Sequence, residues 1–374
     1  MTALISFVSL AVWIGMLVGR GFFWLARERD DKDAPEPDHW PAVVAVVPAR
    51  NEADVIARSL QSLAAQDYPG PFRVIMVDDQ SSDGTAVMAR GLGGRIEVID
   101  GAEHAPGWTG KLFAVAQGVA RASSTAPDYL LLTDADIAHA PDNLRRLVVR
   151  AEAGKLVLVS LMAKLHCESF AERFLIPAFV FFFAMLLPFA RVNNPHRRTA
   201  AAAGGCMLVR REALERAGGI EAIKSEIIDD CALARRLKAQ GPIWLGLSER
   251  AVSLRAYPHI IDIQQMVSRS AYAQLGYSPL ALAGTVIGLA IVYIAPVVAL
   301  FFGGLTALFG ALAWAVMTVA YQPMLHFYRV SAFWGLAMPL IGATYAAFTI
   351  DSAIQHWRGR GGMWKGRAQA IVPT

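Results

Sequence analysis

The acidic residues best placed to do chemistry stand in pairs after short apolar runs of this 374-residue chain. Asp134 and Asp136 form an Asp-x-Asp pair that follows the apolar run 129–132. Alternate spacing lets two carboxylates approach one site, and hard divalent cations such as Mg²⁺ and Mn²⁺ prefer oxygen ligands. Turn formation or helix capping is the alternative role for aspartates after a strand. The spacing alone leaves both roles open.

A second acidic pair, Asp78 and Asp79, stands at the end of the apolar run 72–77. This pair could face a ligand or simply cap the helix that follows. Lys111 comes after the glycine-containing loop 107–110 and opens another predicted helix. A cation at that position could meet a diphosphate together with the helix N-terminus, although a surface lysine would show the same pattern.

Two further features lie in the second half of the chain. Gly204 and Gly205 would let the backbone approach another group closely, since neither carries a Cβ. Asp229 and Asp230 open a helix that is predicted to run to Gln240. Acidic residues near a helix N-terminus cap it favourably. A carboxylate held in a cleft could instead act as a general base and take a proton from an attacking hydroxyl.

Predicted strands and helices alternate through the region that carries these residues. Strands are expected at 42–47, 72–77, 95–99 and 129–133, and helices at 52–65, 86–90 and 111–122. This alternation predicts an α/β fold with a doubly wound, mostly parallel sheet. Ligands bind such sheets at the carboxyl ends of the strands, where both acidic clusters would lie.

The composition indicates that part of the chain lies in lipid. Hydrophobic residues make up 55% and charged residues 18% of the chain, and the mean hydropathy is +0.39. Soluble domains carry about 25% charged residues. The formal charge of +4, from 35 basic and 31 acidic residues, is too small to indicate a nucleic-acid partner. The three cysteines, Cys167, Cys206 and Cys231, lack metal-type spacing and exclude a disulfide scaffold.

The first 41 residues divide into an apolar run and a linker. Residues 1–26 are expected to form a transmembrane anchor, because 3–19 carry no charge. A cleaved signal peptide is the alternative, but no basic residue precedes the run and no clear cleavage site follows it. Basic residues follow the anchor, so the positive-inside rule predicts that the linker, 27–41, is cytoplasmic.

Residues 269–357 are expected to hold the C-terminal membrane segments. No Asp, Glu, Lys or Arg occurs in 270–328, which fits two crossings joined by a turn at Gly303–Gly304. A third apolar run, 330–350, is interrupted by a proline and precedes a basic tail, 358–374. A third crossing would place that tail outside, so this run is expected to dip into the membrane or lie at its surface.

A fourth apolar stretch, 174–190, is rich in phenylalanine and lies between the α/β region and the C-terminal segments. At 17 residues it is short for a membrane crossing, which needs about 20. We expect a helix that lies on the membrane surface. An ordinary buried core helix is the alternative.

Five of these segments together resemble the family 2 glycosyltransferases, which have the GT-A fold. The matching segments are 47–52, 77–85, 133–136, 204–207 and 228–230. The sequence Gly-Trp-Thr-Gly-Lys at 107–111 and the membrane segments are similar to the ceramide-glucosyltransferase-like branch. The segment 272–280 and the Trp-x-Gly-Arg tail resemble the hopanoid-biosynthesis-associated glycosyltransferases of bacteria.

The resemblance implies a nucleotide-sugar donor, linked to UDP, with Asp79 near the base and Asp78 beside it. Asp134 would face the ribose or a metal, and Asp136 would bind the Mg²⁺ or Mn²⁺ that bridges the diphosphate. Lys111 would neutralise phosphate charge. The other residues for which the resemblance implies nucleotide-sugar binding are Pro48, Arg50, Glu52, Gly205 and Arg269.

The resemblance also implies a catalytic pair, Asp229 and Asp230. Asp230 would be the base of a single inverting displacement, activating the acceptor hydroxyl. The family usually has Glu-Asp at this point, so the side chain of Asp229 is one methylene group shorter than the usual glutamate. The family's Gln-x-x-Arg-Trp motif is degenerate, because 266–270 keeps only Arg269.

The function implied is that of an inverting hexosyltransferase in the bacterial inner membrane, which moves a sugar from a UDP-sugar to a lipid hydroxyl, such as that of a hopanoid, at the cytoplasmic surface. Residues 42–165 would form the nucleotide-sugar-binding half and 166–268 the acceptor-side half. A polysaccharide synthase is one alternative, but it would need more membrane crossings than this sequence offers. A membrane transporter or nucleotide-sensing protein is another, but 270–328 lack the ionisable residues of a transport pathway apart from His326.

Overall fold

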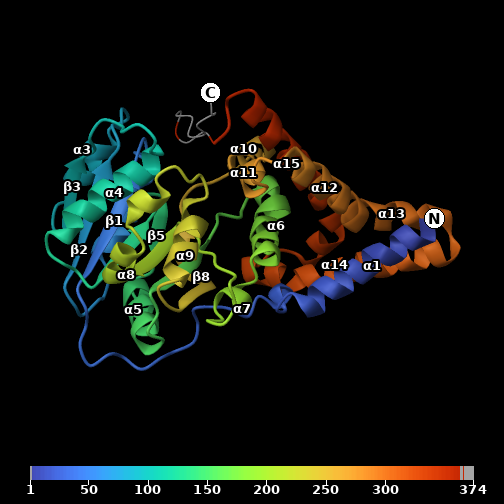
Figure 1. Cartoon of the computed structure of the whole chain (residues 1–374), viewed down its shortest axis with the longest axis horizontal. Coiled ribbons are helices and arrows are strands. Elements are labelled where there is room, and N and C mark those ends of the chain that lie inside the picture. Colours follow the sequence, from blue (N-terminus) through green and yellow to red (C-terminus); the bar gives the residue numbers. More distant parts are fainter. Residues whose placement is uncertain (1, 363–364, 366–374) are drawn as a thin grey trace.

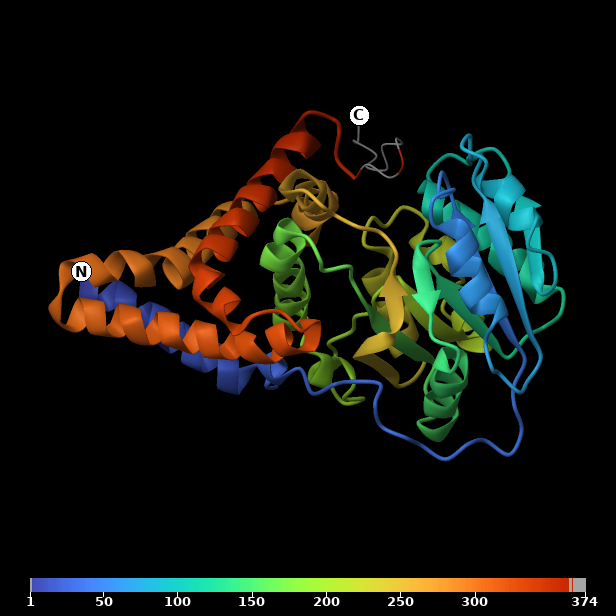
Figure 2. The same ribbon diagram turned by 180° about the vertical axis from the view of Figure 1, so that it is seen from behind.

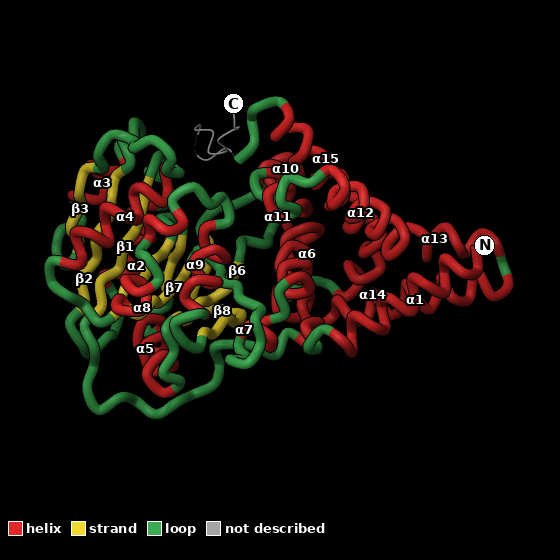
Figure 3. Tube along the Cα trace, viewed as in Figure 1, coloured by secondary structure: helices red, strands yellow, loops and turns green. Residues whose placement is uncertain are grey.

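The computed structural model describes residues 2–362 and 365, and in it the chain divides into an α/β domain and a group of apolar helices. Figure 1 shows the α/β domain on the left and the apolar helices narrowing towards the right. Helix α1 (Thr2–Gly19) begins at the narrow end and runs back towards the α/β domain. The strands all lie within the α/β domain, whereas the rest of the described chain is helical or loop (Figure 3).

The α/β domain is built on one eight-stranded sheet, with the strand order β3-β2-β1-β4-β7-β6-β8-β5. Strands β1 to β4 pair in parallel, β7 runs antiparallel to β4 and β6, and β8 pairs in parallel with β6 and antiparallel to β5. The mostly parallel sheet predicted from the sequence is therefore confirmed. The strands are β1 (Val43–Ala49), β2 (Phe72–Asp78), β3 (Ile96–Asp100), β4 (Tyr129–Thr133), β5 (Ile137–His139), β6 (Leu158–Lys164), β7 (Cys206–Arg210) and β8 (Ile243–Ser253).

Helices cover both faces of this sheet. They are α2 (Ile56–Ala64), α3 (Thr85–Arg90), α4 (Gly110–Ser123), α5 (Asn143–Ala153), α8 (Arg211–Arg216) and α9 (Asp229–Lys238). All seven residues of β1 are buried, as expected of a β-branched run covered on both faces. Val43, Ala45 and Val47 share one core with α2 and α5, whereas Val44 and Val46 share another with α4.

Helix α4 approaches the sheet closely because it has a glycine at the point of contact. A Cβ on Gly118 would lie 2.4 Å from Val46 Cγ1 and 3.0 Å from Val77 Cγ2. Both distances are shorter than a van der Waals contact between carbon atoms. Because Lys111 lies at the start of the same helix, this contact also sets how near Lys111 comes to the strand ends.

Five helical stretches are long and apolar enough to cross a membrane by length and composition. They are Thr2–Gly19, Phe170–Val192, Pro279–Phe302, Gly304–Tyr328 and Ala332–Trp357. The predicted turn between the third and fourth is present at Gly303 and Gly304, whose φ angles of 67° and 53° are positive. Glycine adopts that backbone conformation without the steric cost that a Cβ would add.

The N-terminal helix is tied to the third stretch at a break in its hydrogen bonding. The third stretch consists of α12 (Pro279–Leu289), a π-turn, η3 (Ala290–Ile294), and α13 (Ala295–Ala299). Pro296 has no N–H, so it cannot donate to the carbonyl of Val292 four residues earlier. Ser9 Oγ and Trp13 Nε1 of α1 donate to that carbonyl instead, at 3.3 and 3.1 Å.

The last apolar stretch turns back halfway along α14 (Gly304–Tyr328). Its first part, η5 (Ala332–Ala337), lies against the middle of that helix, where Trp314 Nε1 donates to Leu336 O at 3.0 Å and Thr318 Oγ1 to Gly335 O at 3.1 Å. Helix α15 (Met338–Trp357) then returns to the side of the α/β domain (Figure 2). That this stretch dips into the membrane stays a prediction.

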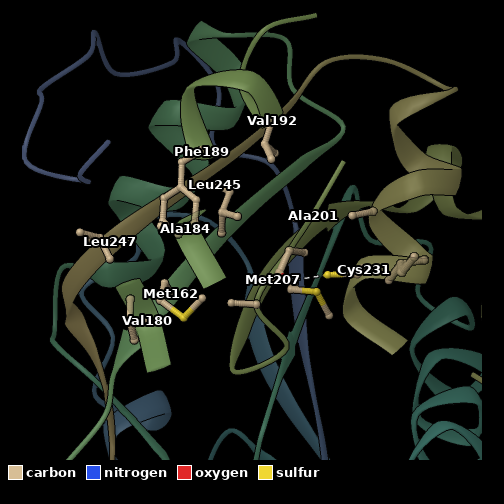
Figure 4. Close-up of a cluster of buried hydrophobic side chains, with 14 of the residues drawn as sticks. Met162, Val180, Ala184, Phe189, Val192, Ala201, Met207, Cys231, Leu245 and Leu247 are labelled. Atoms are coloured by element: carbon tan, nitrogen blue, oxygen red, sulfur yellow. Dashed lines mark hydrogen bonds between the residues drawn. The ribbon is translucent and has the colours of Figure 1, made fainter. Parts of the chain in front are cut away.

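The phenylalanine-rich stretch forms α6 (Phe170–Leu186) and a short helix, α7 (Phe189–Val192). Most of α6 is buried, although Phe170 and Leu186 at its two ends are exposed. This extent of burial is typical of a helix in the interior of the protein, which is the alternative to a helix on the membrane surface. Figure 4 shows the core that joins α6 and α7 to the sheet and to α9; it includes Ala184, Phe189, Met207 and Cys231.

The close contact of α4 with the sheet predicts the effect of one added methyl group. Gly118→Ala should destabilise the fold by about 1–3 kcal/mol, because the Cβ cannot fit beside Val46 without movement of the helix. Gly284→Ala in α12 is the matched control, since nothing lies within 4 Å of the added Cβ. Thermal unfolding in detergent measures both variants, and equal melting temperatures would contradict this account of the α4 packing.

Candidate active site

The carboxyl ends of β1, β2 and β4 lie side by side at one edge of the sheet, because the three strands are adjacent and parallel. Ala49 at the end of β1 pairs with Asp78 at the end of β2. The chain segments that leave this edge carry nearly all the polar residues predicted from the first half of the sequence. They are Arg50, Glu52, Asp78, Asp79, Asp134 and Asp136.

Lys111 holds together two acidic residues from distant parts of the chain. Its Nζ lies 2.9 Å from Asp134 Oδ1, after β4, and 3.2 Å from Asp229 Oδ2, at the start of α9. Gly204 N–H donates to Asp230 Oδ2 at 3.0 Å, and Cys231 N–H donates to Asp230 Oδ1 at 2.6 Å. The predicted catalytic pair and the Asp-x-Asp segment therefore meet at one lysine.

The electrostatics of this group favour a carboxylate that can exchange a proton near neutral pH. Burial, followed by the negative charge of Asp229, raises the pKa of Asp230 to about 6. Burial alone would lower the pKa of Lys111, but Asp134 and Asp229 raise it well above its usual range. Lys111 therefore stays charged, whereas Asp230 has a pKa suited to a general base.

Arg255 forms a second charged group at the same edge. It follows β8, and its Nε donates to Asp136 Oδ2 at 2.8 Å while its Nη2 donates to both carboxylate oxygens of Glu52 at 2.7 Å. Lys365 Nζ reaches the same carboxylate at 2.8 Å and donates to Asn51 O at 2.9 Å. Nothing in the sequence around Arg255 marks a strand end, so its place at this edge could not be predicted, and Lys365 was expected only as part of the basic tail.

The loops after β1 and β2 bind each other and form a third group. Arg50 Nη1 donates to Asp79 O at 2.5 Å and lies 3.7 Å from Asp79 Oδ2. Asn51 Oδ1 accepts from Ser82 N–H at 2.9 Å. Among the described residues, Asp78 Oδ1 is buried without a hydrogen-bond donor. A bound molecule with an N–H or O–H group could supply that donor.

Three other predicted residues, Pro48, Gly205 and Arg269, differ in where they lie relative to these charged groups. Pro48 lines a small cavity together with Lys111 and Asp134. The backbone of Gly204 faces Lys111 and Asp230, whereas Gly205 faces away from them and its carbonyl accepts from Thr133 Oγ1 at 2.7 Å. Arg269 is exposed at the end of α10 (Ile260–Ser268).

The residues at the strand ends could bind a divalent cation only together with a phosphate group. Within residues 2–362 and 365, no group of three or more His, Cys, Asp or Glu side chains could hold a metal ion. Asp134 and Asp136 each have a cationic partner, Lys111 and Arg255. Mg²⁺ commonly binds one or two carboxylates together with substrate phosphates, and this donor set fits that mode.

Comparisons with known proteins show which family the α/β domain resembles. Residues 44–218 match the family model described as glycosyl transferase family 2. The chain is 33% identical over 96 residues to 4,4'-diaponeurosporenoate glycosyltransferase of Staphylococcus haemolyticus, which covers 26% of this chain and 24% of that protein. It is 31% identical over 126 residues to N-acetylglucosaminyltransferase of Mesorhizobium japonicum, covering 32% of this chain and 28% of that one. The matches thus span about a quarter of these relatives.

One solved structure resembles nearly the whole chain. It is the mannosyltransferase PcManGT from Pyrobaculum calidifontis in complex with GDP-Man and Mn²⁺, with a TM-score of 0.54 at 20% identity. The similarity covers 96% of this chain and 99% of that structure, so it extends beyond the α/β domain to the apolar helices. At this identity the likeness establishes the fold. Residues 44–218 are therefore similar to the glycosyl transferase family 2 domain, and the chain has the GT-A-like fold that the sequence predicts.

Proposed function

We propose that this chain is a membrane-bound inverting hexosyltransferase that moves a sugar from a UDP-sugar to the hydroxyl group of a lipid. The observation that carries the proposal is the meeting of Asp230, Lys111 and the Asp-x-Asp segment at one point of the sheet edge. In that arrangement a carboxyl group with a raised pKa lies beside a permanent positive charge. Glycosyl transfer from a diphosphate donor needs both groups close together.

The reaction needs one proton acceptor and a positive charge for the leaving group. Asp230 takes the proton from the acceptor hydroxyl as its oxygen attacks the anomeric carbon of the sugar. The bond from that carbon to the diphosphate breaks with its electron pair on the diphosphate, so a single displacement inverts the configuration. Lys111 offsets part of the negative charge that develops there. A divalent cation bound by Asp136 and Asp134 would supply further positive charge to the diphosphate.

The donor's nucleotide is assigned to the loops after β1 and β2. Asp78 Oδ1 has no donor among the described residues, so it can accept a hydrogen bond from the base or ribose. Arg50 fixes the position of Asp79 through its backbone carbonyl and its carboxylate. The proposed donor site therefore runs from Asp79 along the sheet edge to Lys111.

Two observations support a lipid acceptor. Relatives of the domain are named for the glycosylation of 4,4'-diaponeurosporenoate. The apolar helices join the α/β domain through the core that α6 and α7 share with α9, so a membrane would lie next to the helix that carries Asp230. The similarity of 272–280 and the tail to hopanoid-associated enzymes supports a hopanoid or a related lipid.

The charges at the ends of the apolar helices support a bacterial inner-membrane location with the α/β domain in the cytoplasm. Arg20 at the end of α1 donates to the carbonyls of Met185 and Leu186, at 2.9 Å in both cases. Further basic residues follow in the linker. Helix α15 returns towards the α/β domain, and Arg358 and Arg360 follow its last residue, Trp357. All these cations then face the cytoplasm, as the positive-inside rule requires.

Lipid analysis of a deletion strain tests the whole assignment. Mass spectrometry of lipids from the wild-type and deletion strains should show one glycosylated lipid that disappears with the gene and returns on complementation. Purified protein, supplied with that lipid's unglycosylated form and a UDP-sugar, should restore it. An unchanged lipid profile together with a missing polysaccharide would favour a polymer synthase instead.

Two substitutions separate the roles of the acidic residues. Asp136→Ala should weaken Mn²⁺-dependent binding of UDP and abolish transfer, because it removes a proposed metal ligand. Asp230→Asn should leave UDP binding intact and lower kcat by about 10²–10⁴-fold, since it removes only the base. Isothermal titration and initial rates measure the two effects. Unchanged affinity in Asp136→Ala would reject the ligand assignment, and a mild effect at Asp230 would move the base to Asp229.

The raised pKa of Asp230 predicts the acidic limb of the pH–rate profile. Only the ionised carboxylate accepts a proton, so kcat/KM should fall as the pH drops through about 6. Asp229→Asn removes a negative charge that raises this pKa, and it should therefore move the limb to lower pH. Profiles measured between about pH 5 and pH 8 show the midpoint. A limb at the same pH in both proteins would contradict this electrostatic account.

A further inference from the structure

Lys365 brings the C-terminal part of the chain to the donor edge of the sheet. Its Nζ lies 2.8 Å from Glu52 Oε1 and donates to Asn51 O at 2.9 Å, across 314 residues of sequence. The side chain of Lys365 is only 20% exposed, and that of Glu52 is 8% exposed. The contact is therefore a largely buried ion pair at the edge that carries the proposed donor site.

The end of α15 directs the chain towards this edge. After Trp357 the helix stops, with Gly359 N–H donating to His356 O and Arg360 N–H donating to Gln355 O, both at 2.9 Å. Gly359 has a φ of 71°, the left-handed conformation that commonly ends a helix. A Cβ on Gly361 would approach His356 to 3.1 Å, so the chain passes close to its own helix. The reversal leads from the apolar helices to the α/β domain.

The charges around Glu52 balance only when Lys365 is present. Glu52 and Asp136 carry two negative charges, and Arg255, which contacts both, carries one positive charge. Lys365 supplies the second positive charge, which makes the four groups neutral. Burial raises the pKa of Glu52, whereas Arg255 and Lys365 lower it. Without Lys365 these groups would carry a net charge of −1 at the edge that a diphosphate must approach.

We propose that Lys365 is a positioning residue of the donor site, which neutralises Glu52 and so leaves the charge of Arg255 available to Asp136 and the donor's diphosphate. This inference rests on the proposed function, because its ligand is the nucleotide-sugar donor. It assigns the C-terminal part of the chain a role in donor affinity. The alternative is that Lys365 merely anchors the chain end, in which case its loss would leave donor affinity unchanged.

Nucleotide affinity of the full-length protein in lipid nanodiscs tests this role. UDP binding is measured by isothermal titration with and without Mn²⁺ in the wild type, Lys365→Ala and Lys365→Arg. We expect Lys365→Ala to weaken UDP binding about tenfold in both conditions, since the uncompensated charge of Glu52 then holds Arg255 and repels the diphosphate. Lys365→Arg should keep most of the affinity. Lys155→Ala, at an exposed lysine in the turn after α5, is the matched control.

A double-mutant cycle with Glu52→Gln tests whether Lys365 acts through Glu52. When Glu52 carries no charge, Lys365→Ala should weaken UDP binding by less than about threefold, because there is no negative charge left to neutralise. KM for the UDP-sugar should rise as the affinity for UDP falls, whereas kcat should change little. A full loss of affinity in the Glu52→Gln background would overturn the proposed route through Glu52.

The outcomes separate this inference from the proposed function. Tight UDP binding by the wild type with equal affinity in Lys365→Ala would overturn the role of Lys365 and leave the function standing. A folded wild-type protein that binds neither UDP nor a UDP-sugar would overturn the proposed donor, and the role of Lys365 with it. Melting temperatures of all variants identify a loss of affinity that comes from unfolding, and a Lys365→Ala effect explained in that way would also overturn the inference.

Discussion

The ion pairs of Lys111 with Asp134 and Asp229 are the interaction on which the rest of the site depends. Two carboxylates near each other in a partly buried place repel, and a single lysine between them stabilises both. The lysine comes from α4, while the carboxylates come from the end of β4 and the start of α9. Three elements from distant parts of the sequence are thus held at one point, and Asp230 lies beside them.

The packing of the core places these three elements with little freedom. Gly118 lets α4 lie against β1 and β2, and this contact sets how far Lys111 reaches over the strand ends. The apolar cluster in Figure 4 holds α9 through Cys231 against β7 and connects both to α6 and α7. Glu172 on α6 accepts a hydrogen bond from Tyr257 N–H at 2.6 Å, two residues after Arg255. The apolar helices therefore contact the segment that carries Arg255 directly.

Much of the α/β domain could be predicted from the sequence, because its signals are local. The β-branched runs before Arg50 and Asp79, and the apolar run before Asp134, mark buried parallel strands whose ends must share an edge. The strands β5 to β8 were not predicted, since their pairing, parallel between β6 and β8 and antiparallel elsewhere, joins segments far apart in the sequence. The position of the turn at Gly303–Gly304 followed from glycine and from the length of the flanking apolar runs.

Parts of the site could not be predicted, because they depend on how distant segments fold back. Arg255 is one of many arginines in the sequence, and only the pairing of β8 brings it to Asp136. Gly204 and Gly205 are equivalent by type, yet only Gly204 faces Lys111 and Asp230. Most of the basic tail, 363–364 and 366–374, lies outside the described residues, whereas Lys365 reaches Glu52 because α15 turns back.

A structure of the full-length protein with UDP and Mn²⁺, determined by electron cryomicroscopy in nanodiscs, measures the central claim most directly. The account predicts that the diphosphate lies within hydrogen-bond distance of Lys111, with Mn²⁺ between it and Asp136, and that Asp230 faces the side on which the sugar would be attached. A nucleotide bound away from the ends of β1, β2 and β4, with the Lys111 ion pairs unchanged and uncontacted, would contradict it.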